Sequence, residues 1–253
     1  MTALPSLSIV IATTGPRSAR LVLPPPAPGI DYVVCVQAQT GPVPAWATRA
    51  DARLVPEHSH GLSRNRMAGL AAAQGALVLF SDDDIHLDMA GIDALRAAFA
   101  ADPSLSLALG WRTGHRPETG GRAGPHRLTR FNTGHACVPE IMVRRADVLR
   151  AGVTFDPAFG VGAHYPLGED YIFVTDLLRA GLKGRGFPVE TGAHPHASTG
   201  DDWRDPILMQ ARRAMLARVF GPLHPAMRAL YTIRHRRRFA TRSQALRFLL
   251  GRS

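Results

Sequence analysis

Short apolar runs alternate with polar, turn-forming segments along the first part of the chain. Runs rich in β-branched residues occur at 7–15, "LSIVIATTG", and at 31–41, "DYVVCVQAQTG". Similar runs follow at 76–80, "ALVLF", and at 104–111, "SLSLALGW". Continuous apolar stretches between turn residues are typical of strands buried on both faces. We therefore predict a strand in each segment, and a further strand and short helix within 136–152, "ACVPEIMVRRADVLRAG".

Other segments have helical spacing. Residues 61–75, "GLSRNRMAGLAAAQG", are rich in alanine and leucine, with Ser63 as a possible N-cap and a glycine at the end. A second helix is predicted over about 89–101, and a third begins at Glu169 and ends near Gly181. Strands that alternate with helices predict an α/β fold, with a mostly parallel sheet and helices on both faces. Ligands of such sheets bind beyond the carboxyl ends of the strands.

Composition indicates a soluble globular protein. The 253 residues are 45% hydrophobic with a mean hydropathy of -0.04, and no apolar run reaches the roughly 18 to 20 residues that span a bilayer. The first residues lack a basic leader, so we expect a strand there rather than a signal peptide. Two cysteines, Cys35 and Cys137, cannot form a disulfide framework, which favours a cytoplasmic location. Cys35 lies in an apolar run and is expected to be buried.

The net charge of +10 belongs to the end of the chain. From residue 204 onward there are twelve arginines and one acidic residue, whereas residues 1–203 are close to neutral. We therefore divide the chain into a domain over 1–203 and a basic, mostly helical extension over 204–253. Because the basic charge is confined to the extension, nucleic acid is an unlikely partner for the protein as a whole.

Three consecutive carboxylates follow one of the predicted strands. Asp82, Asp83 and Asp84 follow "LVLF" and Ser81. Adjacent like charges raise one another's pKa and cost stability unless a positive charge lies between them. The cluster is therefore either a solvated turn or a cation site. Asp82 and Asp84, two positions apart, can point to the same side.

Residues 112–135 are rich in glycine, arginine and histidine and have no periodicity. An irregular segment of this length in a compact domain is usually functional or mobile. We expect His115, His126 and His135 to be loop residues near a second substrate. Trp111, just before this segment, is either a platform for a ligand or part of the core.

Five motifs in a fixed order resemble those of the family 2 glycosyltransferases, which have the GT-A fold. They are "LSIVIATTGPR" at 7–17, "GLSRNR" at 61–66, "LFSDDD" at 79–84, "FDPAFGVGAHYPLGEDYIFVTDLLRAG" at 155–181 and "HPHASTG" at 194–200. The resemblance implies transfer of a sugar, with inversion, from a nucleoside-diphosphate donor to a hydroxyl of a saccharide or lipid-linked acceptor. It also implies a Mn²⁺ or Mg²⁺ ion, which suits oxygen ligands beside a diphosphate.

The resemblance assigns a metal site to the acidic cluster. It implies that Asp84 ligates the ion and that Asp82 holds the ribose or the water shell of the metal. Asp83 is placed with the donor-binding residues. The "HP..STG" pattern aligns His194 as a further metal ligand, with His196 as the second candidate.

Other donor contacts are carried over residue by residue. Thr13 and Arg17 match the segment that lines the nucleoside pocket, and Arg64 matches an arginine beside the base and diphosphate. Arg66, on the same predicted helix, is the alternative arginine or a surface residue. The family often has an acidic residue after the second strand, where this chain offers Gln37, or alternatively Gln39, and this departure leaves the base open.

The "GED" motif supplies the predicted base. By resemblance, Asp170 accepts the proton of the acceptor hydroxyl, and Glu169 accompanies it in the catalytic pair. Both carboxylates could instead complement the dipole of the helix that they begin.

Two other functions compete with glycosyl transfer. Phosphotransferases of the haloacid-dehalogenase type also place DxD after a strand, but they need a lysine near the phosphate, and the single lysine here is Lys183. A non-catalytic, basic membrane-surface module would explain the extension but not the acidic cluster. Residues 228–253 mix apolar residues with arginines, so an anionic membrane surface at the inner face of the membrane is a predicted partner.

Overall fold

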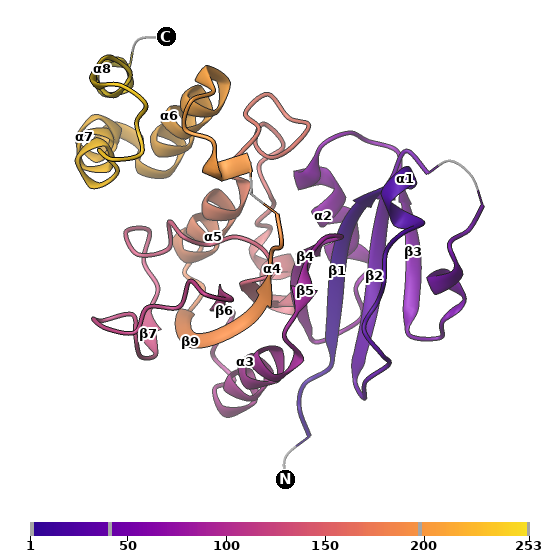
Figure 1. The fold of residues 1–253 in the computed structure, drawn as a ribbon. Helices are drawn as coiled ribbons and strands as arrows, with labels where there is room; N and C mark the ends of the chain where they lie inside the picture. Colours follow the sequence, from indigo (N-terminus) through magenta and orange to yellow (C-terminus); the bar gives the residue numbers. More distant parts are fainter. Residues whose placement is uncertain (1–2, 40–41, 197–198, 252–253) are drawn as a thin grey trace.

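The computed structural model describes residues 3–39, 42–196 and 199–251. The pairs 1–2, 40–41, 197–198 and 252–253 lie outside the described residues, although they belong to the predicted segments 1–203, 31–41, 194–200 and 204–253. Figure 1 shows a twisted central sheet with helices around it and a group of helices at the C-terminal end.

The first half of the sheet is parallel. Its strands are β1 (Leu7–Thr14), β2 (Ile30–Gln37), β3 (Ala52–Glu57) and β4 (Leu77–Asp82), in the order β3-β2-β1-β4. Three of these strands confirm the apolar runs of the sequence, because β1, β2 and β4 are almost completely buried. β3 was not predicted, since it lies at the sheet edge and its sequence, "ARLVPE", is neither continuously apolar nor alternating.

The second half of the sheet is mixed. β8 (Ile141–Arg144) is antiparallel to both β4 and β6 (Leu107–Arg112), and β9 (Gly184–Ala193) is parallel to β6. The two-residue strands β5 (His86–Leu87) and β7 (His126–Arg127) pair with β9. The described residues thus form a mostly parallel mixed sheet of nine strands. β9 was also missed, since "GRGFPVETGA" contains three glycines and a proline, which are uncommon in strands.

Helices cover both faces of the sheet, as predicted. α2 (Leu62–Ala72), α4 (Arg145–Ala151) and α5 (Glu169–Arg179) contribute to one buried apolar cluster. α3 (Met89–Ala101) and the 3₁₀ helix η1 (Ala45–Thr48) contribute to the cluster on the other face. The short helix α1 (Gly15–Ser18) follows β1 directly.

The predicted N-cap at Ser63 is wrong. α2 begins at Leu62, with Gly61 as its N-cap, so Ser63 already lies inside the helix. Its hydroxyl donates a hydrogen bond of 2.7 Å to the carbonyl oxygen of Phe159. The serine therefore joins the start of α2 to the segment before α5, and does not cap its own helix.

The C-terminal segment is helical and packs on the sheet domain. It contains η2 (Thr199–Asp201), α6 (Pro206–Phe220), η3 (Gly221–Leu223), α7 (His224–Arg234) and α8 (Arg242–Leu250). Figure 1 shows these helices gathered beside α5, far from β3. A third apolar cluster includes Tyr171 and Ile172 of α5 together with Met215 and Val219 of α6. The extension that we place at 204–253 thus shares a core with the preceding domain.

No helix among the described residues is long and apolar enough to cross a membrane.

Candidate active site

A cavity of about 1170 Å³ opens at the carboxyl ends of β1, β2 and β4 and continues to α6 and α7. Almost all of the predicted site residues line it: Thr13, Arg17, Gln37, Asp82, Asp83, Asp84, Glu169, Asp170, His194 and His196. The sheet topology brings these residues together, because neighbouring parallel strands end at the same edge. Arg64 is the exception.

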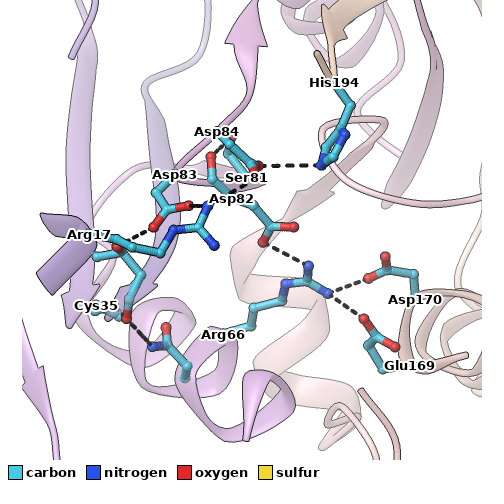
Figure 2. Close-up of polar contacts among 12 residues, drawn as sticks. Arg17, Cys35, Arg66, Ser81, Asp82, Asp83, Asp84, Glu169, Asp170 and His194 are labelled. Atoms are coloured by element: carbon cyan, nitrogen blue, oxygen red, sulfur yellow. Dashed lines mark hydrogen bonds and ion pairs between the residues drawn. The ribbon is translucent and has the colours of Figure 1, made fainter. Parts of the chain in front are cut away.

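Arg66 lies at the centre of the site, with only 1% of its side chain exposed. Its Nη2 donates to Asp82 Oδ1 over 3.0 Å, and its Nη1 donates to Asp170 Oδ1 over 2.6 Å. A longer contact of 3.4 Å joins Nη1 to Glu169 Oε1. Figure 2 shows one guanidinium between the aspartate turn on one side and the start of α5 on the other.

The prediction that Arg64, and not Arg66, lies in the site is therefore wrong. Residues two apart on a helix point about 200° away from each other, so only one of the two can face the site. Arg64 is exposed and does not line the cavity, whereas Arg66 is buried in it. The alternative that Arg66 is a surface residue is excluded by the same burial.

The pKa of Asp170 is raised to about 8. Burial is the main cause, and the charge of Arg66 opposes it, while the nearby carboxylates of Glu169 and Asp82 raise the pKa further. Burial also raises the pKa of Glu169. One guanidinium faces three carboxylates, so it cannot stabilise all of their negative charges at once. Asp170 consequently has the environment of a base that works near neutral pH.

Asp83 and Asp84 are held by Arg17 at the opposite side of the turn. Asp83 accepts a hydrogen bond from the Thr13 hydroxyl and forms an ion pair with Arg17. Burial raises the pKa of Asp83, and these two partners oppose the shift. Arg17 Nη2 also lies 3.0 Å from Asp84 Oδ2. Thr13, Arg17 and Asp83 thus attach the end of β1 to the turn after β4.

Asp84 and His194 lie next to each other in the lining of the cavity. Nε2 of His194 lies 3.4 Å from Oδ1 of Asp84, and that buried oxygen has no hydrogen-bond partner among the described residues. The other ring nitrogen of His194 contacts the backbone oxygen of His196. Between the two candidate histidines, His194 is therefore the one beside the carboxylate.

The described residues contain no group of three or more histidine, cysteine or acidic side chains arranged to hold a metal ion. Asp84 and His194 instead offer two converging ligand atoms. Small divalent cations often take one or two protein ligands and complete their shell with water and substrate phosphates. The pair fits a cation of this kind, whereas Asp82 is held by Arg66 and does not face His194 (Figure 2).

Gln37 and Asn65 fix the floor of the cavity. Nε2 of Gln37 donates to the carbonyl oxygens of Ser59, over 2.7 Å, and Gly61, over 3.2 Å. Nδ2 of Asn65 donates to the carbonyl oxygen of Cys35 over 3.0 Å. Asn65 lines the cavity and was not predicted, although its position in the "SRNR" motif was a signal. Gln39 does not line the cavity.

Trp111 borders the cavity as a nearly buried residue, 5% exposed. Its ring stacks on His135 with a centroid distance of 4.1 Å and an interplanar angle of 6°. The guanidinium carbon of Arg122 lies 5.7 Å from the ring centroid. Burial lowers the pKa of His135 to about 4, so this histidine is neutral. Protein side chains thus cover the Trp111 ring, which agrees with the prediction that Trp111 is part of the core.

The other two histidines of the segment lie outside the cavity, and His126 lies in the short strand β7 and not in a loop as expected. His115 and His126 each bond to a backbone oxygen two residues earlier, and neither lines the cavity. The irregular segment therefore contributes His135 to the site, but neither of these two.

Glu140 is a buried carboxylate that sequence reasoning missed. Its Oε1 accepts hydrogen bonds from the backbone nitrogen and Nε of Arg112, over 3.1 and 3.2 Å. Its Oε2 accepts one from the backbone nitrogen of Cys137 over 3.3 Å. Burial raises the pKa of Glu140 to about 7. Glu140 thereby fixes Arg112 and Cys137, which both line the cavity.

The cysteines have no sign of reactivity. Burial raises the pKa of Cys35 to about 12, as expected for a thiol in the core. Burial also raises the pKa of Cys137 well above its ordinary value. The thiolate forms that nucleophilic catalysis needs are thus disfavoured.

The sequence matches no family model, and no curated protein matches it either. Solved structures do resemble it. S. aureus TarS 1-349 in complex with UDP-GlcNAc is 15% identical with a TM-score of 0.60, over 91% of this chain and 72% of that one. The UDP complex of TarS 1-349 is 15% identical with a TM-score of 0.57, over 91% and 71%. A mycobacterial protein is 16% identical with a TM-score of 0.55, over 85% and 75%. These likenesses show that the chain has the GT-A fold.

Proposed function

We propose that the protein is a glycosyltransferase. It transfers a sugar from a UDP-linked donor to a hydroxyl of a saccharide or lipid-linked acceptor, with inversion at the anomeric carbon. The observation that carries this proposal is one cavity holding both the aspartate turn with His194 and the buried Asp170. The TarS complexes with UDP-GlcNAc and UDP, on the same fold, support a nucleotide-sugar donor.

The donor half of the site would be the turn after β4. Asp84 and His194 would hold Mn²⁺ or Mg²⁺, which neutralises the negative charge that develops on the leaving diphosphate. Thr13, Arg17 and Asp83 keep this turn in place through the contacts described above. Gln37 lines the same half of the cavity, where the nucleoside would bind.

Asp170 would act as the base. In a single displacement, the attacking hydroxyl gives its proton to a carboxylate within hydrogen-bond reach, on the face opposite the leaving group. A base is most effective when its pKa is near the working pH, and the pKa of Asp170 is about 8. Arg66 joins Asp82 to Asp170 and so fixes the distance between the two halves of the site.

The structure gives no support to the haloacid-dehalogenase alternative. Nζ of Lys183 lies 2.8 Å from Asp102 Oδ2 and 2.9 Å from Ser104 Oγ. It does not line the cavity. A lysine held in this place cannot contact a phosphate beside Asp82 without a large movement of the chain.

We also propose a cytoplasmic location with peripheral attachment to the inner face of the membrane. Four large apolar side chains of α7 and α8 are more than half exposed: Leu230, Ile233, Leu246 and Leu250. Arginines lie among them in the sequence of residues 228–253. Apolar residues next to basic ones bind anionic lipid surfaces, at about 1 kcal/mol per basic residue.

Replacing Asp84 with alanine should abolish metal-dependent donor binding. Loss of a metal ligand removes several kcal/mol of charge stabilisation, so transfer should fall by about 100-fold or more. The measurement is the thermal shift caused by UDP with Mn²⁺, followed by transfer rates. Glu118→Gln, an exposed change outside the cavity, is the control. A full Mn²⁺-dependent shift in Asp84→Ala would remove Asp84 from the metal site.

Replacing Asp170 with asparagine should lower transfer by about 100- to 10,000-fold, because the proton acceptor is lost. Donor affinity should change little, and Glu169→Gln should cost less, since Glu169 points about 100° away around the helix. In the wild type, kcat/KM should rise with pH up to about 8, because the base works deprotonated. If Asp170→Asn has the same pH profile as the wild type, or transfers the sugar at the wild-type rate, Asp170 is not the base.

Replacing Arg66 with methionine should destabilise the fold by about 3 to 5 kcal/mol, because it leaves buried carboxylates without their cation. The exposed Arg64→Met should change stability by less than about 0.5 kcal/mol. The loss of stability in Arg66→Met should be smaller at acidic pH. Carboxyls with a raised folded pKa stay protonated in the fold while the unfolded chain ionises, so stability falls as pH rises. Urea unfolding at pH 5 and pH 8 measures both effects, and equal losses in the two variants would contradict the central position of Arg66.

The membrane proposal predicts flotation with anionic vesicles and not with neutral ones. Leu246→Glu together with Leu250→Glu should abolish flotation, because the exposed apolar contacts of α8 are lost. Val22→Glu is the control, since Val22 is 87% exposed in the loop between α1 and β2. Equal, low binding of the wild type to both kinds of vesicle would exclude the membrane as a partner.

A further inference from the structure

The cavity extends well beyond the residues assigned to donor and base. Its volume of about 1170 Å³ exceeds the range of about 300 to 1,000 Å³ that is usual for a single small ligand. The additional part is formed by α6, α7 and the segment before α6, with Trp203, Leu216 and Tyr231 in its wall. A second ligand therefore has room beside the donor.

Three arginines line this part of the cavity, and we call them the arginine wall: Arg212, Arg234 and Arg238. Arg212 is 2% exposed, and its guanidinium carbon lies 4.5 Å from the centroid of Trp203. The guanidinium carbon of Arg238 lies 5.7 Å from the same ring. Arg234 ends α7, one residue before His235. The wall thus brings together α6, the last residue of α7 and the segment that follows α7.

These cations differ from the arginines of the donor half. Arg17 and Arg66 are paired with carboxylates. Within the described part of the chain, no ion pair joins Arg234 or Arg238 to an acidic side chain. Two acidic residues lie nearby: Asp201 lines the cavity, and Asp202 attracts Arg212.

The arginines of the wall also act on one another. Burial lowers the pKa of His235 to about 4, and the charges of Arg238, Arg234 and Arg212 lower it further. Burial lowers the pKa of Arg212, and Arg238 adds to that shift. Three guanidinium groups thus lie near one imidazole, and they outnumber the two nearby carboxylates, Asp201 and Asp202. A bound anion would relieve this repulsion.

We infer that the arginine wall binds the acceptor, and that this acceptor is a saccharide bearing phosphate groups. Guanidinium groups form paired hydrogen bonds with phosphate oxygens, and a phosphate group carries up to two negative charges. Tyr231, in the same part of the cavity, is partly exposed and offers apolar surface for a sugar ring. This inference rests on the proposed glycosyl transfer and names the acceptor class of the same site.

The test uses a short fluorescent polyphosphate as the anionic probe, with saturating UDP and Mn²⁺ present so that the donor half is filled. Arg234→Gln with Arg238→Gln should weaken probe binding by about tenfold or more for each guanidinium. Arg236→Gln with Arg237→Gln removes the same charge from the same segment but from outside the main cavity, and should change binding little. The affinity of UDP is measured for every variant and should stay unchanged.

The outcomes separate this inference from the proposed function. Equal losses in the two double variants would mean diffuse attraction to a basic segment, and would overturn the inference. If the probe does not bind, the inference is overturned. If the protein binds only to phosphatidylglycerol vesicles and not to the probe, the basic segment is a membrane contact. Probe binding that depends on Arg234 and Arg238 while UDP fails to bind would retain the anion site but reject the donor assignment.

Discussion

The central constraint in this structure is the burial of Arg66 among three carboxylates. Asp82 belongs to β4, while Glu169 and Asp170 begin α5, so a single guanidinium joins segments about a hundred residues apart in the chain. Without that cation the three acidic groups would repel one another in a region of low dielectric constant. The arginine therefore permits the concentration of negative charge around which the rest of the site is arranged. Burial is the main cause of the raised pKa of Asp170, and the charge of Arg66 opposes that shift without cancelling it.

The sheet supplies the geometry around this constraint. β1, β2 and β4 are parallel and end at one edge, so the turn after β4 lies beside the end of β1. Thr13 and Arg17 hold that turn from one side, and Arg66 holds it from the other. The antiparallel β8 then connects this half of the sheet to β6 and β9. His194 follows β9 directly, which explains how a residue so late in the chain comes to lie beside Asp84.

The C-terminal helices complete the cavity and do not simply follow the domain. They share an apolar cluster with α5, whose first turn carries Asp170. Gln244 of α8 donates a hydrogen bond of 2.6 Å to the carbonyl oxygen of Trp203, and Arg212 of α6 donates one of 2.6 Å to that of Gly200. The extension thus holds Gly200 and Trp203, which precede α6. The basic charge that looked like a separate tail in the sequence lies partly in the wall of the site.

The sequence by itself determined the elements whose signals are local. Continuous apolar runs located β1, β2, β4 and β6, and the aspartates at the end of β4 located the site, because burial on both faces leaves an uninterrupted pattern. The sequence did not predict β3 and β9. One is an edge strand and the other is rich in glycine and proline, so both form through pairing with their neighbours and not through their own composition.

Only the tertiary structure decided which side chains meet. The sequence does not say which of Arg64 and Arg66 faces inward, because that depends on where α2 begins and how it packs on the sheet. Nor does it bring Glu140 to Arg112 and Cys137, or turn the arginines of the extension toward the cavity. The resemblance put His194 ahead of His196, and the structure places His194 beside Asp84. Such contacts join residues far apart in the chain, and their geometry is fixed by the packing of whole helices and strands. Residue types and order determined the kind of chemistry, while the packing determined which atoms carry it.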